Sequence, residues 1–202
     1  QSRGSQVTGG GIMWYVTDGN HEDHESLDAL PVRDDGLREL APGVLHCPRG
    51  LVLVLEGKRW MFFGGAVSVD KPGRTPGRDW FDREVASQAE FLRACEAGRV
   101  DVLVVHDVPL GSKFWRTHLQ QDRPAWRRET PWRTGMLVAS DQHQRMLGEL
   151  VSVVQPGVLF HGHHHMRVET QIGEAEVHGL GCNGMGQASW MIVDEAGEVI
   201  IG

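Results

Sequence analysis

Short apolar runs separated by polar, glycine-containing turns recur along the chain and predict a mixed α/β structure. Near-continuous apolar runs at 101–105 and 158–161 are typical of strands buried on both faces of a sheet. The β-branched and aromatic run at 12–17 predicts a further strand. Two apolar segments, 51–56 and 59–63, flank Gly57-Lys58, and this pattern indicates a β-hairpin.

Helical periodicity and stop signals predict helices at 23–30, 81–97 and 140–154. In the second of these, five residues are expected to face the core: Val85, Ala89, Phe91, Leu92 and Cys95. The C-terminal part alternates between apolar and polar residues and predicts antiparallel strands, which we place at 167–172, 175–180, 189–193 and 198–201.

The composition is typical of one soluble globular domain. The 202 residues are 40% hydrophobic and 23% charged, and no apolar run is long enough to span a membrane. Three widely spaced cysteines exclude a disulfide framework and a CxxC zinc site, which favours a cytoplasmic location. With a net charge of −7, the surface as a whole does not attract nucleic acids.

Polar motifs follow three of the predicted strands directly. They are Gly19-Asn20-His21-Glu22, His106-Asp107 and Gly162-His163-His164-His165. Ligand sites of open α/β sheets gather at the carboxyl ends of strands, so these motifs could converge. Imidazole nitrogens and amide oxygens bind divalent Mn, Fe, Zn, Co or Ni. We expect His163 and His165 to face the same site, because residues two apart on an extended segment point the same way.

The order of these motifs, G-N-H-[DE], then a strand ending in H-[DE], then G-H-x-H, resembles the calcineurin-like metallophosphoesterase family. The resemblance extends from about residue 12 to the end of the chain. It implies an α/β fold, a metallophosphoesterase-like β-sandwich of mixed sheets flanked by helices, and one domain over 1–202. It also implies hydrolysis of phosphate monoesters or diesters by a water that two divalent metal ions activate.

The resemblance implies a role for each polar residue of the three motifs. Asn20, His106 and His163 would bind one metal ion, and His165 would bind the other. His21 would be catalytic, because it would face the phosphate and assist the leaving group.

One part of the family pattern has no counterpart in this sequence. The D-x-H and G-D-x-x-D motifs of the family, which supply an Asp, a His and a bridging Asp, precede G-N-H, whereas residues 1–17 contain no Asp, Glu or His. We therefore expect a domain that lacks its first strand–helix units, binds at most one ion firmly and is inactive or weakly active.

Basic residues near the motifs are candidates for substrate contact. Arg74 and Arg78 lie in a loop rich in Gly and Pro, and 112–135 is predicted to be a basic insertion with a net charge of +4 and three tryptophans. Arginine binds phosphate through paired hydrogen bonds, and tryptophan stacks on bases. The expected substrate is a small phosphate ester, a nucleotide or a nucleic-acid end. A solvated loop is the alternative interpretation of the insertion.

Two other functions remain open from the residues. The first is a catalytically impaired module of the same fold that binds phosphorylated ligands or a partner. The second is a cysteine hydrolase that uses Cys182 with His178. We rank it last, because Cys182 has no helix N-terminus or basic neighbour to lower its pKa.

Overall fold

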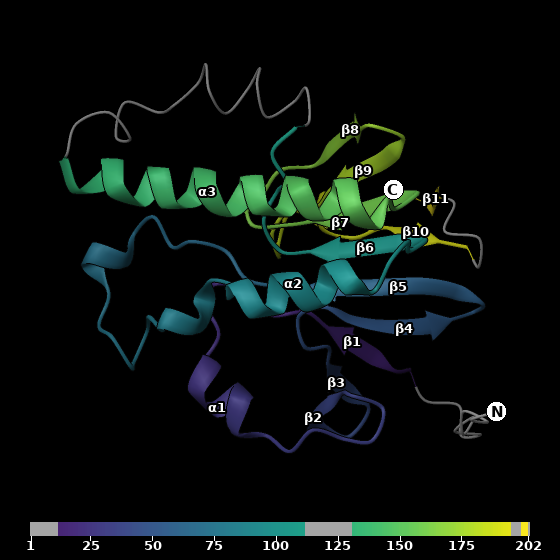
Figure 1. Cartoon of the computed structure of the whole chain (residues 1–202), viewed down its shortest axis with the longest axis horizontal. Coiled ribbons are helices and arrows are strands. Elements are labelled where there is room, and N and C mark those ends of the chain that lie inside the picture. Colours follow the sequence, from purple (N-terminus) through teal and green to yellow (C-terminus); the bar gives the residue numbers. More distant parts are fainter. Residues whose placement is uncertain (1–11, 112–130, 195–198, 202) are drawn as a thin grey trace.

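A six-stranded mixed sheet forms the centre of the molecule in the computed structural model, which describes residues 12–111, 131–194 and 199–201 (Figure 1). The strand order is β4-β5-β6-β7-β9-β8, with four parallel strands in the middle and an antiparallel strand at each edge. Its strands are β4 (Leu51–Leu55), β5 (Lys58–Phe63), β6 (Val102–Val105), β7 (Val158–His161), β8 (Val168–Ile172) and β9 (Ala175–Gly179). The predicted α/β class with mixed sheets is confirmed.

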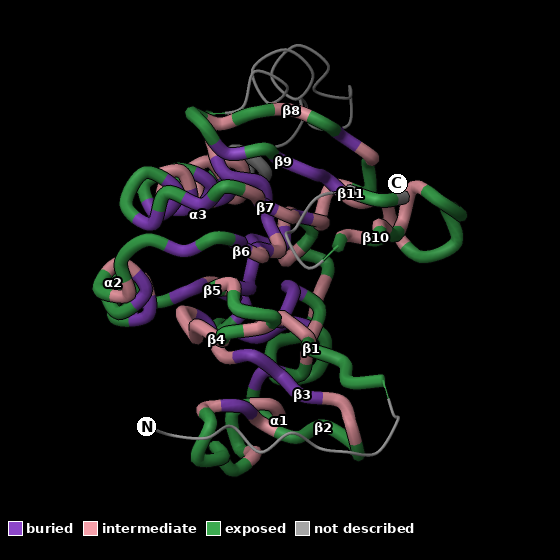
Figure 2. The backbone as a smooth tube through the Cα atoms, turned by 90° about the vertical axis from the view of Figure 1, so that its right-hand side faces the viewer, coloured by how far each residue is buried: buried purple, intermediate pink, exposed green. Residues whose placement is uncertain are grey.

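Two helices, α2 (Gln88–Glu96) and α3 (Pro131–Val154), cover one face of this sheet (Figure 2). Alternate residues of a strand point to opposite faces, so Met61, Phe63, Leu103 and Val105 meet the helices on the same side. The helices contribute Ala94, Leu147, Leu150, Val151 and Val154 to this core. Burial of these apolar surfaces fixes where the carboxyl ends of β6 and β7 lie relative to α3.

A three-stranded sheet of order β1-β3-β2 packs on part of the opposite face. Its strands are β1 (Trp14–Val16), β2 (Arg38–Ala41) and β3 (Val44–His46). Leu45 of β3 joins Leu37 and Phe62 in a second apolar core. Within the described residues β1 pairs only with β3, and Trp14 remains 60% exposed. Within the described residues, β1 therefore leaves an exposed apolar edge.

Short elements complete the chain. They are α1 (His24–Ala29), the 3₁₀ turns η1 (Lys71–Gly73), η2 (Asp82–Glu84) and η5 (Gly186–Ser189), and the antiparallel pair β10 (Ile192–Val193) and β11 (Val199–Ile201). Figure 2 shows β10 and β11 on the side of the central sheet away from α2 and α3. Among the described residues, no helix combines the length and apolar character needed to cross a membrane.

Several predicted boundaries are wrong. The helix expected at 81–97 begins only at Gln88, because Ser87 and Glu90 form a capping box that starts the helix there. Ala89 and Leu92, which were expected in the core, are exposed. The polar strand β2 and the short strand β3 were not predicted, and the strand expected at 189–193 is reduced to β10.

The predicted insertion at 112–135 also needs correction. Helix α3 begins at Pro131, nine residues before the expected start, so 131–135 belong to the helix. The remaining residues of the predicted insertion, 112–130, lie outside the described part of the chain.

Candidate metal centre

Asn20, His106 and His163 meet at the carboxyl ends of β6 and β7, next to the loop that follows β1. Asn20 Oδ1 lies 3.2 Å from His106 Nε2, and the His106 and His163 rings are 5.1 Å apart between centroids. The three motifs are separated by 86 and 57 positions in sequence: the adjacent strands β6 and β7 bring His106 and His163 together, and the packing of the three-stranded sheet brings Asn20 to them. The predicted convergence of these three side chains is confirmed.

The loop that contains Asn20 is shaped by its neighbours in the G-N-H-E motif. The Gly19 amide donates to Glu22 Oε1 at 2.9 Å, which closes the loop. A Cβ on Gly19 would lie 2.9 Å from His106 Cε1, so only glycine allows the loop to approach this ring.

Asp18 anchors the same loop to the core. Arg49 donates to Asp18 Oδ2 through Nε at 2.9 Å and Nη2 at 2.5 Å, and His46 lies 3.3 Å from Oδ1. Burial would raise the pKa of Asp18, but the hydrogen bond from His46 and the charge of Arg49 outweigh it and lower the pKa to about 2. Asp18 is therefore an ionised structural residue whose oxygens are already occupied.

Ser68 sets the orientation of the Asn20 side chain. Asn20 Nδ2 donates to Ser68 Oγ at 2.9 Å, and both residues are buried. Because the amide nitrogen is held by Ser68, the amide oxygen faces His106. The Ser68 amide in turn donates to Glu84 Oε1 at 3.0 Å, which ties this segment to η2.

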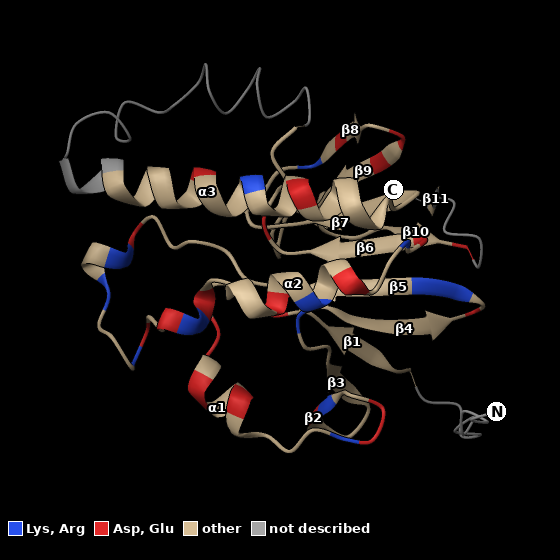
Figure 3. Cartoon of the chain, in the orientation of Figure 1, with Lys and Arg blue, Asp and Glu red and all other residues tan. Residues whose placement is uncertain are grey.

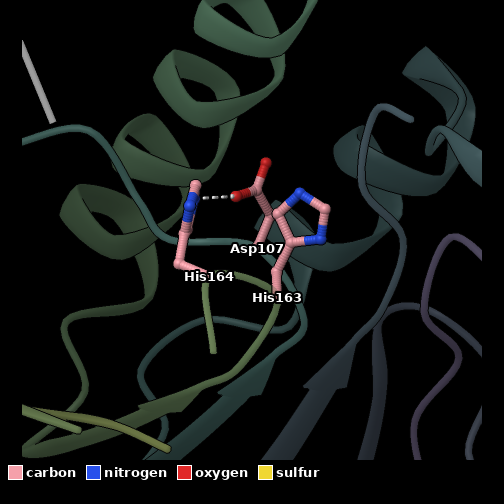
Figure 4. Close-up of side chains that lie close together, drawn as sticks. All are labelled: Asp107, His163 and His164. Carbon is pink, nitrogen blue, oxygen red and sulfur yellow. Dashed lines mark ion pairs between the residues drawn. The ribbon is translucent and has the colours of Figure 1, made fainter. Parts of the chain in front are cut away.

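A second group of possible ligands includes His163. Asp107, His163 and His164 have ligand atoms within 4.8 Å of one another, and Figure 4 shows the two histidines on either side of the carboxylate. His164 Nε2 lies 3.3 Å from Asp107 Oδ1. This cluster could hold a metal ion.

The hydrogen bonds of Asp107 assign it a different task. Its carboxylate accepts from the Val108 amide at 2.7 Å, His143 Nδ1 at 3.1 Å and Gln144 Nε2 at 3.2 Å, besides the contact with His164. These four contacts occupy the lone pairs of the two Asp107 oxygens, so a metal ion could bind there only by displacing one of the hydrogen-bond donors. Burial opposes the ionised form, but the hydrogen bonds of His143 and His164 hold the pKa of Asp107 well below its usual range. Asp107 therefore positions histidines.

Asn20, His106 and His163 offer a second donor set whose atom types suit a divalent ion. Two ligands at about 2.1 Å from one ion lie roughly 3.0–3.5 Å apart in octahedral or tetrahedral geometry, and the 3.2 Å between Asn20 Oδ1 and His106 Nε2 falls in this range. Burial lowers the pKa of His106, and it lowers that of His163 to about 3. Both imidazoles are therefore neutral at pH 7, the form that binds metals.

Of the two predicted substrate arginines, the structure brings only Arg74 to the predicted catalytic residue. Arg74 Nη2 lies 3.2 Å from Nε2 of the exposed His21, and it also donates to Asp70 Oδ2 at 2.7 Å. Arginine has no acceptor, so His21 Nε2 accepts this hydrogen bond. Arg78 is exposed, and within the described residues no hydrogen bond or ion pair holds its side chain.

His165 is not joined to the other candidates by any contact among the described residues, and its side chain is exposed. The reason given for expecting His163 and His165 to face one site is wrong. Their φ angles are +61° and +56°, so both residues are left-handed and the segment is not extended. The assignment of His165 to a second ion remains a prediction.

Four supporting residues of the centre were missed from the sequence: Ser68, Asp107, His143 and His164. Only Asp107 and His164 had a signal, since each lies inside a recognised motif. The cysteine-hydrolase hypothesis loses support. His178 is bound to Glu169 through Nδ1 and stacks on Phe160, and the described residues show no contact between His178 and Cys182.

Comparison with family models and with curated proteins found no match for this chain. The function is therefore argued from the residues and the geometry.

Proposed function

We propose that the chain is a calcineurin-like metallophosphoesterase domain that binds a divalent ion and acts on phosphate esters. The order of the three motifs supports this proposal, and so does the layered arrangement of the sheets and helices. The main observation is the meeting of Asn20, His106 and the His163 ring at the carboxyl ends of β6 and β7, where the spacing of Asn20 Oδ1 and His106 Nε2 fits two ligands of one ion.

Each nearby side chain has a task in this proposal. Asn20, His106 and His163 hold the ion, which when bound neutralises phosphoryl charge and lowers the pKa of a bound water. Arg74 supplies a fixed positive charge beside His21 for the oxygens of the phosphate. Since His21 Nε2 accepts from Arg74, the proton that neutral His21 offers to a leaving group is on Nδ1.

Three carboxylates near this centre are already engaged. Asp18 is bound by Arg49, Asp70 by Arg74 and Asp107 by His143. These three carboxylates are therefore not free to bridge two ions, which favours a single ion per chain. The same observation supports the alternative function, a catalytically impaired module that binds phosphorylated ligands.

Metal binding by the 202-residue chain is the first test. Chelator-treated protein is titrated calorimetrically with Mn²⁺ and Zn²⁺, and the dialysed complex is analysed for metal content. We expect about one ion per chain or fewer. Two tightly held ions would contradict the assignment of the carboxylates, and no binding at all would contradict the proposed function.

Matched substitutions separate ligand from substrate residues. His163→Ala should abolish firm metal binding, whereas His21→Ala should leave the metal content unchanged. Equal loss of metal in both variants would contradict this division of roles.

Two further measurements on the metal-loaded wild type separate the enzyme from the binding module. Hydrolysis of an aryl phosphate that His21→Ala abolishes supports the enzyme. Binding of a non-hydrolysable phosphonate without any hydrolysis supports the module.

A further inference from the structure

A polar cavity of about 170 Å³ lies beside the loop that anchors the candidate metal centre, but its lining includes none of the candidate ligands. It is bounded by α1, β2, β3, η2 and α2, and together these elements carry charged residues of both signs (Figure 3). Four arginines, two histidines and three carboxylates line it, together with only two apolar residues. Such a lining is unusual for a space between packed elements, because charged side chains are rarely buried unless each is paired.

Arg49 is the most buried cation of this lining, with 3% of its side chain exposed. Its Nε and Nη2 donate to Asp18, and Nη2 also donates to the Arg83 carbonyl oxygen at 2.7 Å. Its Nη1 has no hydrogen-bond partner, and the Glu90 carboxylate lies 3.8 Å away. A buried guanidinium nitrogen without an acceptor indicates that an acceptor is needed at this place.

Two further arginines of the lining have unused donors. Arg38 contacts Asp28 through Nη2 at 3.3 Å, while its buried Nε has no partner. Arg93 is exposed, and within the described residues no hydrogen bond or ion pair engages its guanidinium. Three guanidinium groups with unused N–H donors therefore line one cavity.

The charge of the lining is also unbalanced. Four arginines and three carboxylates leave a formal charge of +1, not counting the two histidines. Each of the three carboxylates already accepts a hydrogen bond from Arg49 or Arg83. The remaining demand is therefore for negative charge and hydrogen-bond acceptors. Water supplies the acceptors but leaves the charge unbalanced, whereas an oxyanion supplies both.

We propose that this cavity binds a small tetrahedral oxyanion, phosphate or sulfate, through N–H groups of Arg38, Arg49 and Arg93. The cavity volume exceeds the roughly 30 Å³ that one water occupies in the liquid, so it has room for such an ion. This binding needs no metal, and the inference therefore does not depend on the proposed function.

Calorimetric titration of the full chain with phosphate tests the proposal. The protein is kept in chelator at fixed ionic strength, so that no metal centre can recruit phosphate. We expect one saturable site per chain, with competition by sulfate and none by equimolar chloride. Sulfate and phosphate also stabilise proteins without specific binding, so saturable binding is the deciding observation, and a rise in melting temperature does not suffice.

Substitutions locate the site. Arg93→Gln and Arg38→Gln should each raise the Kd for phosphate about tenfold or more, since each removes a charged donor. The control is Arg145→Gln, because Arg145 is an exposed arginine of α3 outside the cavity, and its Kd should equal that of the wild type. Absence of saturable binding would overturn the proposal. Saturable binding that neither Arg93→Gln nor Arg38→Gln weakens would overturn it too.

Discussion

Replacing Ser68 by alanine removes one oxygen from the support of the candidate metal centre. In the wild type this oxygen accepts from Asn20 Nδ2 at 2.9 Å, and Ser68 is only 1% exposed. Without it the buried amide nitrogen has no partner, and the side chain can rotate by 180° to seek another acceptor. Rotation would place the amide nitrogen, which cannot bind a metal ion, against His106.

The size of the effect follows from these contacts. Loss of a group that orients a metal ligand typically weakens metal binding 10- to 100-fold, or about 1.4–2.7 kcal/mol. We expect the lower end for Ser68→Ala, because the His106 and His163 ligands remain. The unpartnered amide should also reduce the stability of the metal-free protein by about 1–3 kcal/mol.

Calorimetric titration with Mn²⁺ and Zn²⁺ measures the first effect, and urea unfolding in chelator measures the second. Ser152→Ala is the matched control, because Ser152 is exposed on α3 and its hydroxyl donates to the Gly148 carbonyl oxygen. A Ser68→Ala protein that binds metal as tightly as the control would refute the argument that Ser68 orients Asn20. Failure of the wild type to bind metal would instead refute the proposed function.

Two further predictions concern stability. Burial would raise the pKa of Glu90, but its hydrogen bonds with Arg83 and other donors lower it to about 2, so this pair contributes stability above about pH 4.5 that is lost as the pH falls towards 2. Urea unfolding at pH 6 and pH 3 should show a loss of about 1–3 kcal/mol that Glu90→Gln reduces. Gly64→Ala should destabilise the fold by about 1–3 kcal/mol, because its Cβ would lie against the Asp18 carbonyl oxygen. Gly135→Ala lies on α3 with open space around the new Cβ and should stabilise the fold by up to about 1 kcal/mol. Equal changes in the free energy of unfolding for Gly64→Ala and Gly135→Ala would contradict this packing argument.

The hydrophobic pattern predicted the central strands well, because a strand buried on both faces appears in the sequence as a continuous apolar run. Leu51–Leu55 and Lys58–Phe63 form the expected hairpin, but its turn is Glu56-Gly57 and not the expected Gly57-Lys58. Both turn residues have the positive φ angles that tight hairpin turns require. The strand Arg38–Ala41 was missed, because three of its four residues are exposed and it has no apolar face that alternation could reveal.

The ligands of the candidate centre were predictable, whereas their supports were not. His106 and His163 follow the adjacent parallel strands β6 and β7, which bring such positions together, and Asn20 follows β1 of the smaller sheet. Ser68 and His143 lie in a loop and inside a helix, 48 and 36 positions from the residues they bind. Their partners depend on how α3 and the loop after β5 approach the strand ends, which no local pattern encodes.

Backbone conformation gives an independent argument that the histidine run serves a function. Four non-glycine residues of the described chain have positive φ, and two of them, Glu56 and Gln155, lie in a hairpin turn and directly after a helix. The other two are His163 and His165. Left-handed backbone costs a non-glycine residue of the order of 1 kcal/mol, and glycine would avoid this cost. Glycine would therefore be less strained at both positions, and a role of the side chain would account for the histidine. For His163 the ring contact with His106 supports such a role, whereas no contact within the described residues explains the histidine at position 165.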